Sequence, residues 1–145
     1  KKEAIEVYQR LSRDSLIGNQ NIYIREYKPL RRLAEGLNGL PISEEYRFFI
    51  FDGKIVSSAF YWSSHIDDLT EVPTPDRVPK SFMREVISRI GLNARFVVVD
   101  VAIQEDGTPI VIELNDGQMS GLSENDPNIL YSNLKKSLDF SLSAT

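Results

Sequence analysis

The sequence predicts an α+β domain in which antiparallel β-hairpins pack against helices. Two observations lead to this class. Asp-Gly pairs stand between strand-like apolar runs at Asp52-Gly53 and Asp106-Gly107, and such pairs are the strongest short-range signal for a β-hairpin. Segments with helical spacing of apolar residues lie before, between and after these runs. Helices mixed with antiparallel hairpins are typical of α+β domains.

Composition sets the broad class of the protein. The chain has 145 residues, 41% of them hydrophobic, which is enough for one domain with its own core. A net charge of −4 argues against nonspecific nucleic-acid binding as the main activity. No apolar stretch approaches the roughly 20 residues of a membrane span, and cytoplasm is the default compartment. The chain begins directly in a helical pattern, so we expect a fragment of a larger protein.

The first half of the chain is expected to contain a helix, a strand and a hairpin. Lys2 to about Leu16 has helical spacing of apolar residues. Asn21 to Tyr27 alternates like a strand. The following segment contains several breakers, although Leu30 to Leu37 could form a short helix. Glu45 to Trp62 reads as a hairpin around Asp52-Gly53.

The second half is expected to contain two helices separated by the second hairpin. Ser63 to Val78 reads as a surface loop, and Pro79 to Ile90 is an amphipathic helix that Gly91 ends. Phe96 to Asn115 forms the hairpin. Asp126 and Pro127 then supply an N-cap and a first-turn proline for a last helix.

Asp100, Glu113 and Asn115 are the strongest candidates for a functional site. A turn centred on Asp106-Gly107 places residue 104 opposite 109 and Asp100 opposite Glu113, with Cβ atoms about 5 Å apart. Asn115 points to the same face. Facing carboxylates repel each other, and a divalent cation removes the repulsion; an all-oxygen set suits Mg²⁺. The alternative is two acids on a solvated sheet face, and a one-residue register slip would remove the site.

The pattern of Asp100, Asp-Gly and Glu113-x-Asn115, followed by a loop of small residues from Asp116 to Asp126, resembles the metal-binding end of ATP-grasp enzymes. The resemblance implies that Asp100 and Glu113 bind Mg²⁺ or Mn²⁺ held by the phosphates of ATP, and that Asn115 binds a second ion. It implies the C-terminal subdomain of the ATP-grasp fold. The family's N-terminal substrate domain and Gly-rich lid are expected outside this chain.

The resemblance also assigns cofactor-binding and catalytic residues in the first half. Glu26 and Tyr27 match the strand end that contacts adenine through its backbone. Glu45 would lie near the ribose, and Arg47 would face the phosphates or an acyl phosphate. The alternatives are an ordinary strand end and a local Glu45–Arg47 pair, which would contribute about 0–1 kcal/mol at a surface.

Other charged and aromatic residues leave alternatives open. Arg25, Lys28, Arg31 and Arg32 form a basic cluster, which is either a solvated face or a site for phosphates or an acidic substrate. In the family that the chain resembles, several carboxylate–amine ligases place one arginine near the end of the strand that here holds Tyr61-Trp62, and another where this chain has Val98. Acyl transfer would therefore depend on Arg47 or Arg95. The loop histidine, His65, reads as a surface residue, and the alternatives are a metal site with Asp67 and Asp68 or a catalytic base.

The resemblance to ATP-grasp enzymes implies an ATP-dependent carboxylate–amine or carboxylate–thiol ligase that acts through an acyl phosphate. ATP and an unidentified carboxylate would be its ligands. The 145 residues alone are expected to be inactive. The alternatives are a non-catalytic nucleotide-binding or interaction module on the same fold, and an ATP-dependent phosphotransferase.

Overall fold

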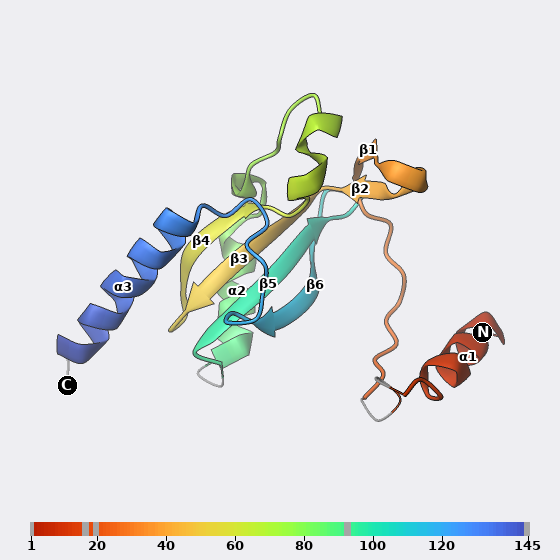
Figure 1. Ribbon diagram of the computed structural model, residues 1–145, viewed down its shortest axis with the longest axis horizontal. Helices are drawn as coiled ribbons and strands as arrows, with labels where there is room; N and C mark the ends of the chain where they lie inside the picture. Colours follow the sequence, from red (N-terminus) through yellow and green to blue (C-terminus); the bar gives the residue numbers. More distant parts are fainter. Residues whose placement is uncertain (1, 16–17, 19–20, 92–93, 144–145) are drawn as a thin grey trace.

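Helices and antiparallel strands alternate along the chain, which confirms the predicted α+β class (Figure 1). The computed structural model describes residues 2–15, 18, 21–91 and 94–143. The helices are α1 (Lys2–Leu11), α2 (Lys80–Ile90) and α3 (Pro127–Ser143). The strands are β1 (Arg32–Glu35), β2 (Pro41–Ser43), β3 (Glu45–Phe51), β4 (Lys54–Phe60), β5 (Phe96–Ile103) and β6 (Pro109–Asp116). Short 3-10 helices cover Leu37–Gly39, Ser63–Asp68 and Pro75–Arg77.

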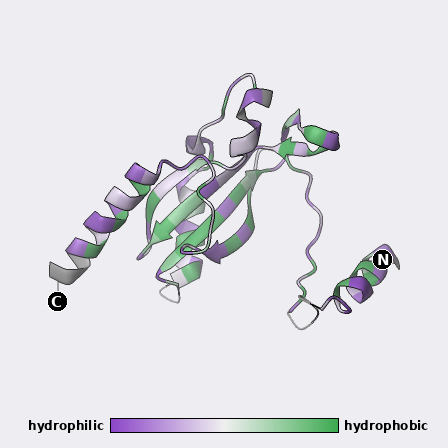
Figure 2. Ribbon diagram, in the orientation of Figure 1, coloured by the Kyte–Doolittle hydropathy of each residue, from purple (hydrophilic) through white to green (hydrophobic). Residues whose placement is uncertain are grey.

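The two predicted hairpins join into one four-stranded antiparallel sheet with the order β4-β3-β5-β6. Helix α2 packs on one face, where Met83 and Val86 belong to the same core cluster as Tyr46 and Val99. Helix α3 and the loop before it cover the other face, where Leu130 joins Phe49 and Val98. Figure 2 shows the apolar residues concentrated in the central strands. Both faces of β3 and β5 are therefore shielded from water.

Complete burial of β3 and β5 explains their apolar runs and makes their polar residues conspicuous. Every residue of β3 is buried, and so is every residue of β5 after Phe96. Central strands covered on both faces are expected to be apolar throughout. Glu45, Arg47 and Asp100 break this pattern with ionisable side chains that are at most 7% exposed. Such groups need partners, because burying an unpaired charge is costly.

Two predicted elements in the first half are wrong. Residues 21–27 are extended but form no strand ladder among the described residues, and they lead from α1 to the sheet (Figure 1). Tyr23 and Tyr27 are 83% and 85% exposed. The segment therefore has an alternating sequence but neither the partner strand nor the buried face that would stabilise a strand. Residues 30–37 contain β1 instead of a helix, because β1 pairs with β2. Gly39, with a φ of 78°, permits the tight return between them.

The predicted helices are largely confirmed. Helix α1 ends at Leu11 rather than near Leu16, which lies outside the described residues. Helix α2 ends at Ile90, followed by Gly91 with a φ of 61°. The predicted N-cap of α3 is present, because the amide of Asn128 donates to Asp126 Oδ1 at 2.7 Å. None of the described helices has the length and apolar character required to cross a membrane.

Candidate functional site

The β5–β6 hairpin brings the two predicted metal-binding carboxylates face to face. Asp100 is directly opposite Glu113 in the ladder, as predicted. The predicted register nearer the turn is wrong by one residue, because Ile103 rather than Gln104 is opposite Pro109. A β-bulge between the turn and Asp100 adds one residue to β6, and this restores the predicted pairing of Asp100 with Glu113. Val111 is opposite Val101 and Glu113 is opposite Asp100, so Ile112 is the additional residue.

The bulge decides which face Glu113 and Asn115 occupy. One added residue shifts the pairing register, and in a strand that exchanges the two faces. Beyond the bulge, Asn115 is opposite Val98, two residues from Asp100. The three predicted metal ligands therefore share one face. Asp100 is 1% exposed, whereas Asn115 is half-buried and Glu113 is exposed, so this cluster is open to solvent on the β6 side.

Arg47 faces Asp100 from the neighbouring strand β3 and binds both carboxylate oxygens. Its Nε donates to Oδ1 at 2.8 Å and its Nη2 to Oδ2 at 2.7 Å. The third nitrogen, Nη1, donates to the carbonyl of Gly121 at 2.8 Å. The guanidinium also lies 4.8 Å from the centre of the Tyr61 ring. The hydrogen bonds to Asp100 raise the pKa of Arg47 further, so the guanidinium stays charged.

Glu45 lies two residues before Arg47 on the same face, and it is almost fully buried. It is 6% exposed and accepts a hydrogen bond from Ser43 Oγ at 3.1 Å. Burial raises the pKa of Glu45 to about 7, and the nearby charges of Asp100 and Glu113 contribute in the same direction. The hydrogen bond from Ser43 and the charge of Arg47 oppose the shift. Glu45 therefore changes protonation state near neutral pH.

The raised pKa predicts that Glu45→Gln stabilises the protein at alkaline pH. Because the folded-state pKa of about 7 exceeds the ordinary value of 4.5, the folded form binds the proton more tightly. The free energy of unfolding therefore falls as pH rises from 4.5 to 7. At 1.36 kcal/mol per pKa unit, the variant should gain up to about 3 kcal/mol at pH 8. At pH 4 it should match the unaltered protein. Urea denaturation of both proteins across this range measures the difference; a constant difference would contradict the assignment.

Glu26 and Tyr27, the predicted adenine-edge residues, line a cavity of about 470 Å³ that is also lined by Ile112, the residue before Glu113. Glu26 pairs with Lys28 at 2.9 Å. Apolar side chains from β6 and the first part of the chain complete the walls: Leu30, Pro41, Ile110 and Ile112. Ser43 also lines this cavity and donates to Glu45. The cavity therefore adjoins the face that carries Glu45, Arg47 and Asp100.

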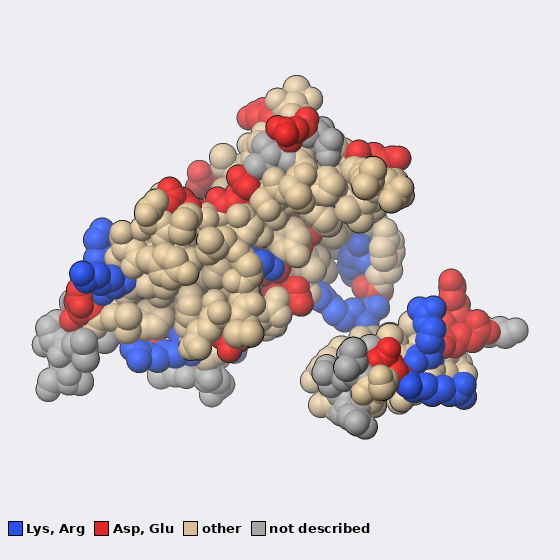
Figure 3. Space-filling view, in the orientation of Figure 1, with Lys and Arg blue, Asp and Glu red and all other residues tan. Residues whose placement is uncertain are grey.

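The basic cluster of the first half is engaged in specific contacts. Arg25 donates to two backbone carbonyls of β6, Arg31 binds the fully buried Glu44 at 3.0 Å, and Arg32 pairs with Glu35. In the view of Figure 3, basic side chains form separate groups instead of one extended patch. His65 packs against Trp62, with ring centres 6.0 Å apart. The contacts of Arg25 and Arg31 are not visible in the local sequence, because their partners are distant along the chain. The Arg32–Glu35 and Trp62–His65 pairs are local, with the partners three positions apart in each case.

Asn125 is a site-supporting residue that the sequence reasoning missed. It is 4% exposed, its Oδ1 accepts from Ser57 Oγ at 2.5 Å, and its Nδ2 donates to the carbonyl of Leu122 at 3.0 Å. With the Arg47–Gly121 contact, it fixes the end of the 116–126 loop to the sheet. The only sequence signal is a short polar residue just before the Asp-Pro start of α3.

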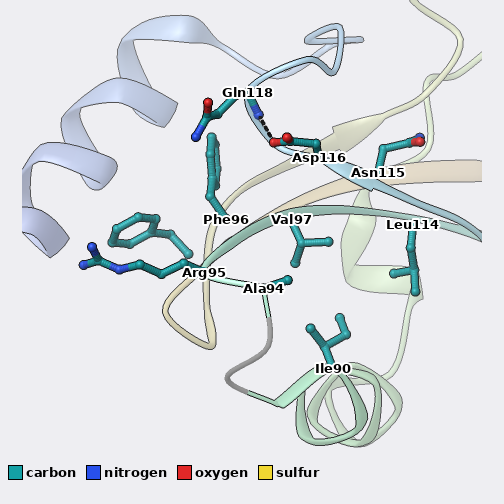
Figure 4. A pocket seen from close by; sticks show the side chains of 10 residues that line it. Ile90, Ala94, Arg95, Phe96, Val97, Leu114, Asn115, Asp116 and Gln118 are labelled. Atoms are coloured by element: carbon teal, nitrogen blue, oxygen red, sulfur yellow. Dashed lines mark hydrogen bonds between the residues drawn. The ribbon is translucent and has the colours of Figure 1, made fainter.

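A second cavity, of about 730 Å³, lies at the other end of the β5–β6 pair. Figure 4 shows Val97 and Leu114 between Ile90 of α2 and the polar pair Asp116 and Gln118. The amide of Gln118 donates to Asp116 Oδ1 at 2.9 Å. Asn115 lines this cavity, but Arg47, Asp100 and Glu113 do not. Size alone therefore does not identify the chemical site.

The donor set of the cluster fits a hard cation. Asp100, Glu113 and Asn115 offer carboxylate and amide oxygens, which Mg²⁺ prefers. Within the described residues, no three His, Asp or Glu side chains already converge in a metal-binding arrangement. Arg47 engages both oxygens of Asp100, so cation binding would require Asp100 to share or exchange this partner. Glu113 is the more accessible carboxylate.

Comparison with known proteins identifies the family. A family model described as "ATP-grasp domain, R2K clade family 3" matches residues 1–134. Comparisons with curated proteins and with solved structures gave no significant match. The family match covers the sheet, α2, the loop that crosses the site and the first part of α3. The chain therefore belongs to the ATP-grasp domains, a family of ATP-binding folds, and within it to family 3 of the R2K clade.

Proposed function

We propose that this chain is the nucleotide- and metal-binding part of an ATP-dependent ligase that activates a carboxylate as an acyl phosphate. An amine or a thiol would then attack the activated carbonyl. The observation that carries the proposal is the pairing of Asp100 with Glu113 across β5–β6, with Asn115 on the same face. Arg47 adds a cation on the adjacent strand. This is the charge arrangement that phosphoryl transfer requires.

The geometry supports a direction for ATP along this face. The cavity at Glu26 and Tyr27 has apolar walls suited to adenine. Ser43 links that cavity to Glu45, which we assign to the ribose. The phosphates would then extend toward Glu113 and Arg47. Successive parts of the nucleotide thus meet an apolar cavity, a hydrogen-bonding group and a charged cluster.

Asp100, Glu113 and Asn115 would hold Mg²⁺ or Mn²⁺, which when bound neutralises phosphate charge and polarises the transferring group. Arg47 would orient a phosphoryl oxygen, because its planar fork fits phosphate as well as carboxylate. Arg95 is a poorer candidate for this role. It forms a two-point pair with Asp52, both at 2.9 Å, at the far end of β5. Arg47 is therefore the residue we assign to the transfer step.

A non-catalytic nucleotide-binding module is the second candidate. The observation that favours it is the engagement of all three Arg47 nitrogens by Asp100 and Gly121, which leaves none directed at a phosphate. Release of ADP and phosphate from ATP, measured in the full-length protein with a panel of carboxylates and amines, separates the two. An ATP-dependent phosphotransferase would instead yield a stable phosphorylated product.

Binding of Mg-ATP to the Glu113→Gln variant tests the metal assignment. Glu113 is exposed, so the substitution should leave the unfolding midpoint unchanged. Removing a ligand charge should weaken the metal-dependent affinity by about 10-fold or more. Calorimetric titrations with Mg-ATP and with metal-free ATP measure this difference.

Glu105→Gln is the matched control for that titration. Glu105 is exposed on the same hairpin, near its turn, and loses the same charge. Its Mg-ATP affinity should stay at the unaltered value. Equal affinities of the Glu113 variant and the unaltered chain, or equal losses in both variants, would reject the metal site.

A further inference from the structure

Arg25 holds the edge strand β6 at its bulge. Its Nη1 donates to the carbonyl of Ile112 and its Nη2 to the carbonyl of Val111, both at 2.7 Å. In a regular strand, successive carbonyls point to opposite edges, so one guanidinium does not reach both. The two carbonyls therefore face the same side at this point. They belong to the additional residue of the bulge and its predecessor.

This contact lies at the point where the register of the hairpin changes. On the turn side of the bulge, Val101 is opposite Val111, and on the other side Asp100 is opposite Glu113. Without the bulge, Asp100 would be opposite Ile112, and Glu113 and Asn115 would turn to the opposite face. Asp100, Glu113 and Asn115 therefore share one face of the sheet only because of the bulge.

Strand β6 has few other constraints on its register. It is the last strand of the sheet, with β5 as its ladder partner, and its residues are half-buried or exposed. Edge strands with one weakly buried side are prone to register slippage. Arg25 comes from the extended segment between α1 and the sheet, so it supplies a contact from outside the hairpin.

We propose that Arg25 is a positioning residue for the metal site: its guanidinium locks the β6 bulge and so keeps Glu113 and Asn115 on the face of Asp100. The inference rests on the proposed function for the identity of the ligand, but its structural part rests on the two backbone contacts. Two parallel donors are required, because a single donor leaves one of the two carbonyls without its partner. Arg25 itself touches no metal ligand in this role.

The experiment compares Arg25→Ala, Arg25→Lys and the unaltered chain. Binding of ADP is titrated calorimetrically with and without Mn²⁺, because Arg25 also lines the cavity assigned to adenine. Loss of a positioning residue should reduce the metal-dependent gain in affinity by about 10- to 100-fold in the alanine variant. The metal-free ADP affinity should stay constant. The lysine variant should retain part of the gain.

Amide exchange of residues 111–116 in the ligand-free proteins gives a second readout. Exchange should be faster in Arg25→Ala than in the unaltered chain. Arg89→Ala is the control, because Arg89 pairs with Glu85 on the surface of α2. It should change neither measurement.

The outcomes separate the two proposals. Absence of a Mn²⁺-dependent gain in the unaltered chain would overturn the proposed function. A normal gain in the unaltered chain and in both Arg25 variants, with unchanged exchange in β6, would overturn the role of Arg25. Equal loss of metal-free and metal-dependent affinity would also overturn it, because that result indicates a direct contact with the nucleotide.

Discussion

Replacing Arg47 with alanine is expected to lower the free energy of unfolding by about 3–5 kcal/mol, because the substitution leaves the charge of Asp100 buried without its partner. Asp100 is 1% exposed, and Arg47 supplies two hydrogen bonds to its oxygens. The same substitution removes the contact that ties Gly121 to the sheet. Urea denaturation of the variant at pH 7 measures the loss.

Arg95→Ala is the matched control for this measurement. Arg95 also forms a two-point pair with an aspartate, Asp52, and it also lies over an aromatic ring, that of Phe51. Its side chain is 61% exposed, however, and that of Asp52 is 34% exposed. Exposed pairs contribute about 0–1 kcal/mol. Equal costs of the two substitutions would show that burial does not determine the strength of the Arg47 pair.

A double-mutant cycle with Asp100→Ala completes the test. When both charges are removed, the penalty for an unpaired buried charge disappears. The double variant should therefore be more stable than the sum of the single variants predicts. Additive effects would indicate that Arg47 and Asp100 are not coupled in the folded protein.

The sequence predicted the Asp100–Glu113 pair correctly, although the register assumed near the turn was wrong by one residue. The bulge compensates for that error, and no residue in the uninterrupted apolar run Ile110 to Ile112 marks it. A bulge is recognised by its hydrogen bonds and by the partner strand, and neither is available from local sequence. The correct pairing of Asp100 with Glu113 therefore came from two offsetting features, the misplaced turn register and the bulge.

The Arg47–Asp100 pair was beyond sequence reasoning for a different reason. The two residues are on strands from different hairpins, and only the order β4-β3-β5-β6 brings them together. Local spacing suggested a Glu45–Arg47 pair, but the fork of Arg47 turns to Asp100. The predicted strand at residues 21–27 was wrong for a related reason. Their alternation fits a strand, but strand formation also requires a neighbouring strand to pair with.

The loop from Asp116 to Asp126 is expected to close over bound Mg-ATP. Its middle is already fixed by the Arg47–Gly121 contact, and its end by the hydrogen bond from Ser57 of β4 to Asn125. Within the described part of the chain, however, the amides of residues 120–123 donate no hydrogen bond. Consecutive free amides form a suitable site for phosphate oxygens. The loop therefore has both an attachment to Arg47, the partner of Asp100, and unused backbone donors next to that attachment.

Amide exchange with and without Mg-ATP tests this closure. At a nucleotide concentration of 100 times Kd, about 1% of the protein is unliganded, so exchange of residues 120–123 should slow by up to about 100-fold. The amides of Glu124 and Asn125 are internal references, because they already donate to the carbonyls of Phe60 and Leu122. Their exchange should change much less. Equal exchange of residues 120–123 in both states, under conditions where calorimetry shows saturation, would leave the loop as a connector between β6 and α3. Slower exchange confined to these amides would instead place the phosphates beneath the loop, beside Arg47 and Glu113, because closure there excludes water from the charged cluster.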